Sequence, residues 1–406
     1  MTSCIQTTRR GSACRGVLVA IAFLAASGCS FDAVNPGAIE ERALGTEPAL
    51  VGLVNGFIGD YDDAFQRKVL YAGLLSDEIR ASGSWSWWHD ADKLGFIDAE
   101  APTGDLFNIP HFLWRPEQRA RFLAEETYGR IQEHVESPES SPLAAMSRLY
   151  SGMARLDIAQ MFCYSTVDGG PRIERPEALD MAGKHFTEAI TIATEAGVDS
   201  IAQMAHLMRA RVRLAKEDYA GAAEDASAVP TGFLWIAHFR NAPGETNDMW
   251  FQINRRVEGT IQEPFQNTGD PRVPVVNTGK KGADNVTPRF DQMKYPDQFT
   301  PMPMGTWQEA RLIQAEAAIR ATQTAAGVGF LNQVRAAAEL PALNTSMSNA
   351  DAMTALRTER RMQLFLEGHR YTDMRRFNEF PANWQMTCVP LPLAETQNNP
   401  NLQGGG

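Results

Sequence analysis

The chain has 406 residues, of which 44% are hydrophobic and 21% charged, a composition typical of a globular protein with one large domain or two. Its formal net charge at pH 7 is −11. Because the phosphates of nucleic acids require a basic footprint, this acidic balance argues against a nucleic-acid partner.

The first 28 residues have the organisation of a signal peptide. Three arginines without any acidic residue precede an apolar run at residues 16–26, which is shorter than the roughly 20 residues that span a bilayer. Small residues then lead to Cys29, as in a bacterial lipobox, so we expect Cys29 to carry lipid. An ordinary secretory signal with a coincidental cysteine is the alternative. No other stretch is long and apolar enough to cross a membrane, so we expect attachment by lipid alone.

Two cysteines, Cys163 and Cys388, remain in the body of the chain after the signal peptide and Cys29 are set aside. Thiols in an oxidising compartment pair when the fold brings them together, so a disulfide and two free thiols both remain open. The spacing of the cysteines is not that of a metal site.

Helical periodicity runs through most of the sequence and predicts a mainly α-helical fold, a tetratricopeptide-like helical-repeat scaffold with one long irregular insertion. Residues 178–196 and 201–228 resemble two tetratricopeptide units, with small alanines that let paired helices approach each other. A repeat unit cannot bury its apolar face alone, so both units imply helical neighbours. Further helices are expected at residues 47–60, 64–75, 112–135, 143–164, 309–322 and 328–339.

We expect residues 29–406 to form a single domain, with helical repeats over about 143–229 and 306–378. The intervening residues 240–305 are rich in Pro, Gly, Asn and Asp and contain only short β-like runs. Such a stretch inside a compact domain is typical of a functional or irregular elaboration. Residues 81–92 are predicted to be a loop, because they are rich in Ser, Gly and Trp and follow no regular period.

The segment at residues 355–377 places charged side chains between apolar ones at helical spacing: Glu359, Arg360, Glu367, Arg370 and Asp373. We expect Glu367 to pair with Arg370, and Arg370 with Asp373, since each pair is three residues apart on a helix. Buried charges are tolerated only when each has a partner. We therefore interpret these residues as a structural ion-pair network, and a catalytic acid–base site is the alternative.

The same segment carries a family resemblance. Its run ERRMQLFLEGHRYTDMRR, from Glu359, resembles the ERR-x-EL-x-FEG-x-R-x-x-DLRR segment of the SusD/RagB family, with Gln363 where that family usually has Glu. Three other stretches resemble further family segments in the same order and at similar spacing: RLIQAEA from Arg311, LNQVR from Leu331, and VPLPLAE followed by NPNL from Val389. Asp270-Pro271-Arg272 resembles a further element of that family.

Members of that family are surface lipoproteins of outer-membrane nutrient uptake. The resemblance implies a SusD-like fold, no cofactor, and a lipid-anchored position on the outer membrane that faces the cell exterior. It implies a TonB-dependent, SusC-like transporter as partner and an oligosaccharide or peptide as ligand. A repeat scaffold that binds another protein, without a small-molecule ligand, is the alternative function.

Trp85, Trp87, Trp88, His89 and Asp90 are the candidate ligand-binding residues. Flat aromatic faces suit sugar rings, and the neighbouring polar side chains suit their hydroxyls. Members of the family that bind sugars place an aromatic platform in a loop after the first helices, which this position approximately matches. The alternative is that these tryptophans anchor the loop to the scaffold. Neither HExxH nor G-x-S-x-G occurs in the sequence, so we expect no enzyme and no metal site.

Overall fold

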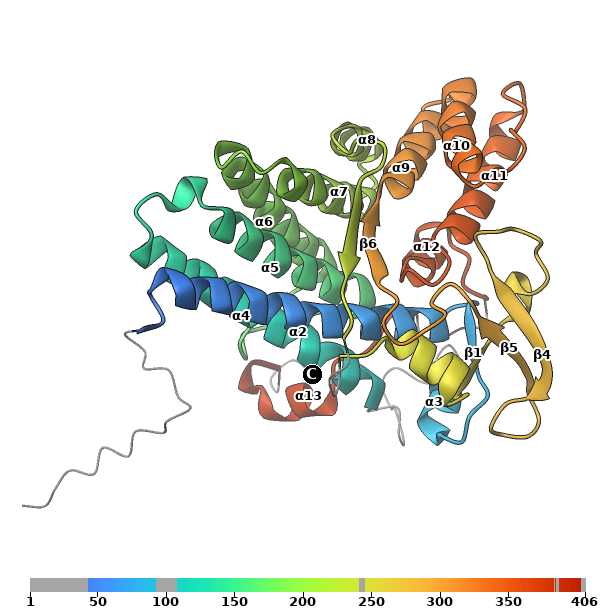
Figure 1. The fold of residues 1–406 in the computed structure, drawn as a ribbon, viewed down its shortest axis with the longest axis horizontal. Coiled ribbons are helices and arrows are strands. Elements are labelled where there is room, and N and C mark those ends of the chain that lie inside the picture. The colour runs from blue at the N-terminus through green and yellow to red at the C-terminus, as the bar shows by residue number, and fades with distance from the viewer. Residues whose placement is uncertain (1–42, 93–107, 241–244, 383, 385–386, 403–406) are drawn as a thin grey trace, which may run out of the picture. The chain divides into compact units, whose positions relative to one another are not determined.

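The computed structural model describes residues 43–92, 108–240, 245–382, 384 and 387–402 (Figure 1). The predicted signal peptide and Cys29 lie outside these ranges. Across the residues that are described, none of the helices combines the length and hydrophobicity needed to cross a membrane.

The described structure is mainly helical, which confirms the predicted fold class. The helices are α2 (Glu47–Leu74), α3 (Ser86–Ala91), α4 (Asn108–His134), α5 (Pro142–Met161), α6 (Arg175–Glu195), α7 (Asp199–Ala215), α8 (Tyr219–Ser227), α9 (Trp307–Arg320), α10 (Thr324–Ala337), α11 (Asn349–Gln363), α12 (Arg370–Arg376) and α13 (Leu393–Asn398). The tetratricopeptide-like segments correspond to α6, α7 and α8.

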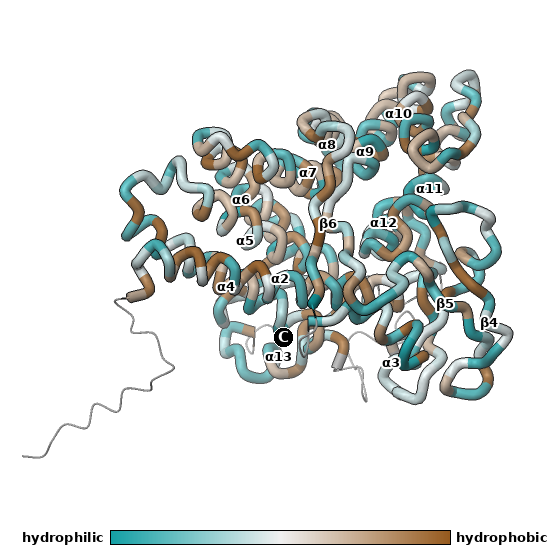
Figure 2. Tube along the Cα trace, viewed as in Figure 1, coloured by the Kyte–Doolittle hydropathy of each residue, from teal (hydrophilic) through white to brown (hydrophobic). Residues whose placement is uncertain are grey.

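Helix α2 is continuous where two helices were predicted. Its buried apolar residues recur at helical spacing: Leu50, Val54, Phe57 and Tyr61. Figure 2 shows the resulting alternation of hydrophobic and hydrophilic residues along the helix. The break was expected near residues 61–63, but the Tyr61 hydroxyl donates a 2.7 Å hydrogen bond to the buried carboxylate of Asp157 on α5. This contact holds the middle of α2 against the core.

Consecutive helices pack against each other in pairs from α4 to α10, while α2 packs on both α4 and α5, and α11 packs back on α9. Small side chains allow these close approaches. Helix α6 buries Ala182, Ala189 and Ala193, and α7 buries Ala205 and Ala210. The arrangement is that of stacked helical repeats, in which each pair covers the apolar face of its neighbour.

The strands lie mostly in the predicted irregular insertion and form two-stranded antiparallel ribbons. Strand β1 (Ile79–Ala81) pairs with β3 (Gly259–Ile261), β2 (Leu234–Ala237) with β6 (Met302–Thr306), and β4 (Val275–Lys281) with β5 (Pro288–Gln292). The β2–β6 ribbon leads directly into α9, whose cap is Thr306. The hydroxyl of Thr306 accepts a hydrogen bond from the Glu309 backbone N–H, the capping contact that this sequence motif favours.

The charged segment at residues 355–377 is interrupted and does not form one helix. Helix α11 ends at Gln363, and α12 begins at Arg370. Between them, Leu366 and Gly368 have φ values of 53° and 78°. Backbone in this left-handed region cannot continue a right-handed helix, so the chain turns between α11 and α12.

Cys163 and Cys388 form a disulfide, which settles the question that the sequence left open. The bond joins the residues just after α5 to a segment 225 residues later. Backbone pairing accompanies it, because the Cys163 N–H donates to the Val389 carbonyl and the Val389 N–H donates to the Met161 carbonyl, both at 2.9 Å. The C-terminal segment is therefore attached to the first helical repeats.

Candidate functional site: a groove along helix α2

The tryptophan-rich segment folds into the short helix α3, where a loop was predicted. Trp85 and Trp87 are half-buried, and their rings stack with centroids 5.2 Å apart. The Arg256 guanidinium carbon lies 4.0 Å from the centroid of the Trp85 ring, and the ring centroid of Phe112 on α4 lies 5.4 Å from that of Trp87. We call this row, Arg256–Trp85–Trp87–Phe112, the aromatic ladder. Its ring faces are largely used in contacts with each other.

Trp88 differs from the other two tryptophans, because it fits the alternative interpretation in which the side chain anchors the segment to the scaffold. Its side chain is fully buried, and a Cβ added to Gly259 of β3 would come within 2.9 Å of its ring. The ring therefore anchors α3 against the β1–β3 ribbon. His89 is half-buried, and its Nε2 lies 3.0 Å from the Gly83 carbonyl. The side chain of Asp90 lies outside the described part of the structure.

Next to the ladder, the exposed face of α2 is hollowed by two cavities. The larger, of about 720 Å³, lies between α2 and the residues after β2, and its lining includes Gly56, Gly59, Asp62, His238 and Arg240. The bare α2 backbone forms part of its floor, because a Cβ at Gly56 or Gly59 would meet no atom within 4 Å. A volume of this size accommodates a small ligand.

The smaller cavity, of about 270 Å³, shares Asp60, Asp63 and Arg67 with the larger one. It continues between α2 and α4 to His111 and to Phe112, the last ring of the aromatic ladder. We call the two cavities together the α2 groove. Sequence reasoning did not find it, because its walls come from three separate segments. Its one local signal was a pair of glycines within a predicted helix, beside three aspartates.

Most charged side chains of the α2 groove are paired with each other. Arg67 contacts Asp63 at 3.0 Å, and Asp60 accepts a 3.0 Å hydrogen bond from Arg119. Arg240 pairs with Glu245 across the outer edge of the larger cavity. These pairs fix the shape of the walls and leave the glycine-lined floor open.

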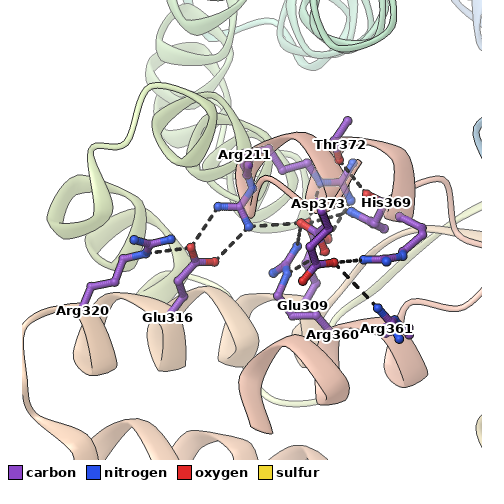
Figure 3. Close-up of polar contacts among 12 residues, drawn as sticks. Arg211, Glu309, Glu316, Arg320, Arg360, Arg361, His369, Thr372 and Asp373 are labelled. Carbon is purple, nitrogen blue, oxygen red and sulfur yellow. Dashed lines mark hydrogen bonds and ion pairs between the residues drawn. The ribbon is translucent and has the colours of Figure 1, made fainter. Parts of the chain in front are cut away.

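The predicted ion-pair residues Glu359, Arg360, Glu367, Arg370 and Asp373 are all buried. At the centre, Arg360 of α11 binds both oxygens of Asp373 on α12, at 2.8 and 2.9 Å. Arg376 then bridges Asp373 to the fully buried Glu316 of α9. Figure 3 shows Glu316, Arg360 and Asp373 converging from these three helices.

The partners of the other network residues differ from the predicted ones. Glu367 pairs with Lys294 at 2.7 Å, and Arg370 pairs with Asp77 and Glu379 at 2.6 and 2.5 Å, so neither pair of residues three apart forms. The turn at Leu366 and Gly368 places Glu367 outside α12, which removes the helical spacing of the Glu367–Arg370 pair. Arg370 and Asp373 both lie on α12, but Asp373 is bound by Arg360 and Arg376 instead.

Glu359 connects the network to the insertion. It accepts a 2.7 Å hydrogen bond from Arg272, whose guanidinium also binds Asp270, and it pairs with Arg335 of α10. The Asp270-Pro271-Arg272 element is thus held against the C-terminal helices by charge.

The charge partners decide the ionisation of the buried carboxylates. Burial alone would raise the pKa of Glu316 and Asp373, but Arg376, and for Asp373 also Arg360, hold both pKa values below their ordinary range. Burial and the nearby arginines lower the pKa of His369 well below its ordinary value, so this imidazole is neutral. The arrangement suits structural cross-linking of helices, since every carboxylate named here is already occupied by a cation.

Among the residues that the structure describes, His, Cys, Asp and Glu do not form a group of three or more able to hold a metal ion.

Comparison with known proteins gives one family match. Residues 309–403 match the model of the SusD family, and this stretch holds the predicted ion-pair residues and the closing motif at 389–402. A search of curated protein sequences gives no match to the chain.

Several solved structures share the fold. A SusD superfamily protein from Bacteroides vulgatus superposes with a TM-score of 0.67 at 12% identity, over 88% of this chain and 98% of that one. A SusD superfamily protein from Bacteroides thetaiotaomicron has a TM-score of 0.67 at 13% identity, over 87% and 98%. A SusD-like carbohydrate binding protein from Bacteroides vulgatus has a TM-score of 0.63 at 12% identity, over 81% and 83%.

Proposed function

We propose, from the premise that this chain is a member of the SusD/RagB family, that it is a nutrient-binding protein of the cell surface. Its ligand is a carbohydrate, and it passes that ligand to a TonB-dependent transporter of the outer membrane. The observation that carries the proposal is the α2 groove, a cavity of ligand size that ends at an aromatic ladder. A solved structure of the same fold is a SusD-like carbohydrate binding protein, which supports a sugar as the first ligand to test.

The groove has the features that sugar recognition requires. Carboxylates and an amide line its wall and can accept or donate hydrogen bonds to hydroxyls: Asp60, Asp63 and Gln66. Phe112 lines one end of the groove, next to Trp87, and offers apolar contact to the C–H face of a sugar ring. Trp85, Trp87 and His89 remain candidate ligand residues in this proposal, while Trp88 supports them from the core.

The binding part of the proposal is tested by isothermal titration calorimetry of the purified protein against a panel of neutral oligosaccharides and short peptides. We expect at least one oligosaccharide to bind and to raise the melting temperature, because a ligand that binds only the native state stabilises it. Release of a cleaved product from any ligand would indicate an enzyme. Absence of binding across the panel would favour a scaffold.

The position on the membrane follows from Cys29. We propose that residues 1–28 are removed, that residues 29–406 form one domain, and that lipid on Cys29 anchors it to the outer membrane, facing outward. More than one acyl chain is needed for stable anchoring, at about 0.8 kcal/mol per buried methylene. Replacing Cys29 with Ala should abolish labelling with radioactive palmitate and release the protein from the membrane. Continued labelling of that variant would refute the lipid anchor.

A second function is favoured by a separate cavity. A hollow of about 580 Å³ between α8 and α9 is lined by alanines together with Tyr219, Arg320 and Phe330. Grooves between stacked helices suit an extended or helical segment of another protein. In this alternative the chain is a scaffold lipoprotein, and cross-linking through Ala223→Cys in this cavity would capture a protein while the α2 groove stays empty.

A further inference from the structure

The larger cavity of the α2 groove contains one carboxyl group that the ion pairs leave unmatched. Asp62 is only 8% exposed and lines the cavity. Its Oδ2 accepts a 3.2 Å hydrogen bond from the His238 backbone N–H. Its Oδ1 is buried and has no hydrogen-bond partner among the described residues. A buried carboxyl oxygen without a donor is costly, so it marks a place that a ligand can complete.

Three of the four carboxylates that line this cavity have a cation. Asp63 pairs with Arg67, Glu245 with Arg240, and Asp60 with Arg119, while Asp62 is the fourth. Asp62 therefore lines the cavity without a cation bound to it.

We propose that the α2 groove binds a ligand bearing a primary ammonium group, which Asp62 receives on its free oxygen. The geometry selects ammonium among cations. Because only one oxygen of Asp62 is free, the forked guanidinium, which prefers to bind both oxygens of a carboxylate, is a poor match. An ammonium group is a compact charge that donates single hydrogen bonds. A neutral hydroxyl would satisfy the oxygen but leave the charge of Asp62 unbalanced.

The ionisation of Asp62 supports this assignment. Burial raises its pKa to about 7, partly offset by the His238 hydrogen bond and by Arg240. Other ionisable groups face it from each neighbouring element: Asp60, Asp63 and Arg67 from α2, His238, Arg240 and Glu245 from the segment after β2, and Tyr150 from α5. An incoming ammonium group stabilises the ionised carboxylate and displaces its proton, so binding at pH 7 should release about half a proton.

The inference rests on the proposed function, since it names the ligand class of the same groove. Two kinds of ligand carry a primary ammonium group, an amino sugar and a lysine-containing peptide. Two pairs of matched probes distinguish between them. The first pair is the tetramer of glucosamine and the same tetramer N-acetylated. The second pair is Gly-Lys-Gly and its form acetylated on the lysine side chain. Acetylation removes the charge and keeps the chain length within each pair.

We expect one charged probe to bind at least about tenfold more tightly than its acetylated partner, because a hydrogen bond between charged groups is worth one to two decades in affinity. Asp62→Asn keeps the size of the side chain and removes its charge, so it should abolish this preference. Glu195→Gln, at the exposed end of α6 and outside the groove, is the matched control that removes an equal charge. It should leave the preference unchanged.

A second measurement on the unmodified protein covers the case in which Asp62→Asn fails to fold. Calorimetric titration in two buffers of different ionisation enthalpy reports the proton released when the preferred charged probe binds. Release of about half a proton at pH 7 supports the proposal. No proton release, equal affinity within both probe pairs, or no binding of either charged probe would overturn it. If neutral oligosaccharides bind while the charged probes do not, the proposed function stands and this inference alone fails.

Discussion

Substitutions that fill the α2 groove from its floor test whether the groove is a ligand site or an unoccupied cavity. Gly56 and Gly59 line the larger cavity from α2, and a Cβ at either position would meet no atom within 4 Å. Leucine at both positions would therefore enter empty space without displacing the fold. The double variant Gly56→Leu/Gly59→Leu should occupy the floor of the cavity and exclude a ligand from it.

The double variant should be more stable than the wild type, whereas most substitutions destabilise a protein. Glycine inside a helix costs about 0.8–1 kcal/mol relative to alanine, and leucine is nearly as favourable as alanine. The double variant should therefore raise the free energy of unfolding by about 1–2 kcal/mol. Affinity for the oligosaccharide should fall by at least about tenfold, because the side chains occupy its volume. Loss of binding in a more stable protein cannot be attributed to unfolding.

The assay combines urea denaturation with calorimetric titration on the same preparations. The matched control is Gly52→Leu/Gly129→Leu, which places leucine at two other exposed helical glycines with open space around them, on α2 and α4. The control should gain similar stability and retain full affinity. Wild-type affinity in Gly56→Leu/Gly59→Leu would refute the assignment of the α2 groove as the ligand site.

Four further outcomes follow from the same structure. Arg370→Ala removes the nearest cation of Asp77 and Glu379, which keep only longer contacts with Arg361 and Arg357, so it should lower the free energy of unfolding by about 1–3 kcal/mol; an unchanged denaturation curve would contradict a structural role. Replacing Cys163 and Cys388 together with Ser should cost about 2–5 kcal/mol, because the disulfide closes a very long loop, and reduction of the wild type should reproduce this loss. Burial raises the pKa of Glu78 to about 8, so the stability that its neutral carboxyl contributes is present at acidic pH and is lost as pH rises from about 5 through about 8. Glu78→Gln should lessen that loss, and parallel pH–stability curves for the variant and the wild type would contradict this expectation. Trp88→Ala should cost about 3–5 kcal/mol, a core substitution cost that a surface aromatic would not show in a melting experiment.

Local sequence signals predicted the helices well because their physical causes are local. Thr306 and Ser348 cap the helices that follow them, as their side chains accept hydrogen bonds from Glu309 and Asp351. The stripes of small apolar residues on α6 and α7 predicted the repeat-like packing of these helices. The tetratricopeptide-like fold class was therefore readable from the chain alone.

The details of the site depended on distant contacts that no local pattern reports. Arg370 binds Asp77, which lies 293 residues earlier, in place of a neighbour three residues away. Trp88 is buried because Gly259 leaves room for its ring. The carboxylate of Asp62 accepts a hydrogen bond from the His238 backbone N–H, and only the folded chain brings His238 next to α2. Sequence reasoning located the charged segment and the tryptophans but could not assign their partners.

The central claim, capture of a nutrient for a membrane transporter, is tested most directly by isolating the protein from native membranes. The measurement is affinity purification at native abundance and low salt after mild detergent extraction, followed by mass spectrometry of the bound proteins. We predict recovery of one much larger TonB-dependent transporter in stoichiometric amount. Recovery of the protein alone, or with unrelated proteins only, would contradict the account.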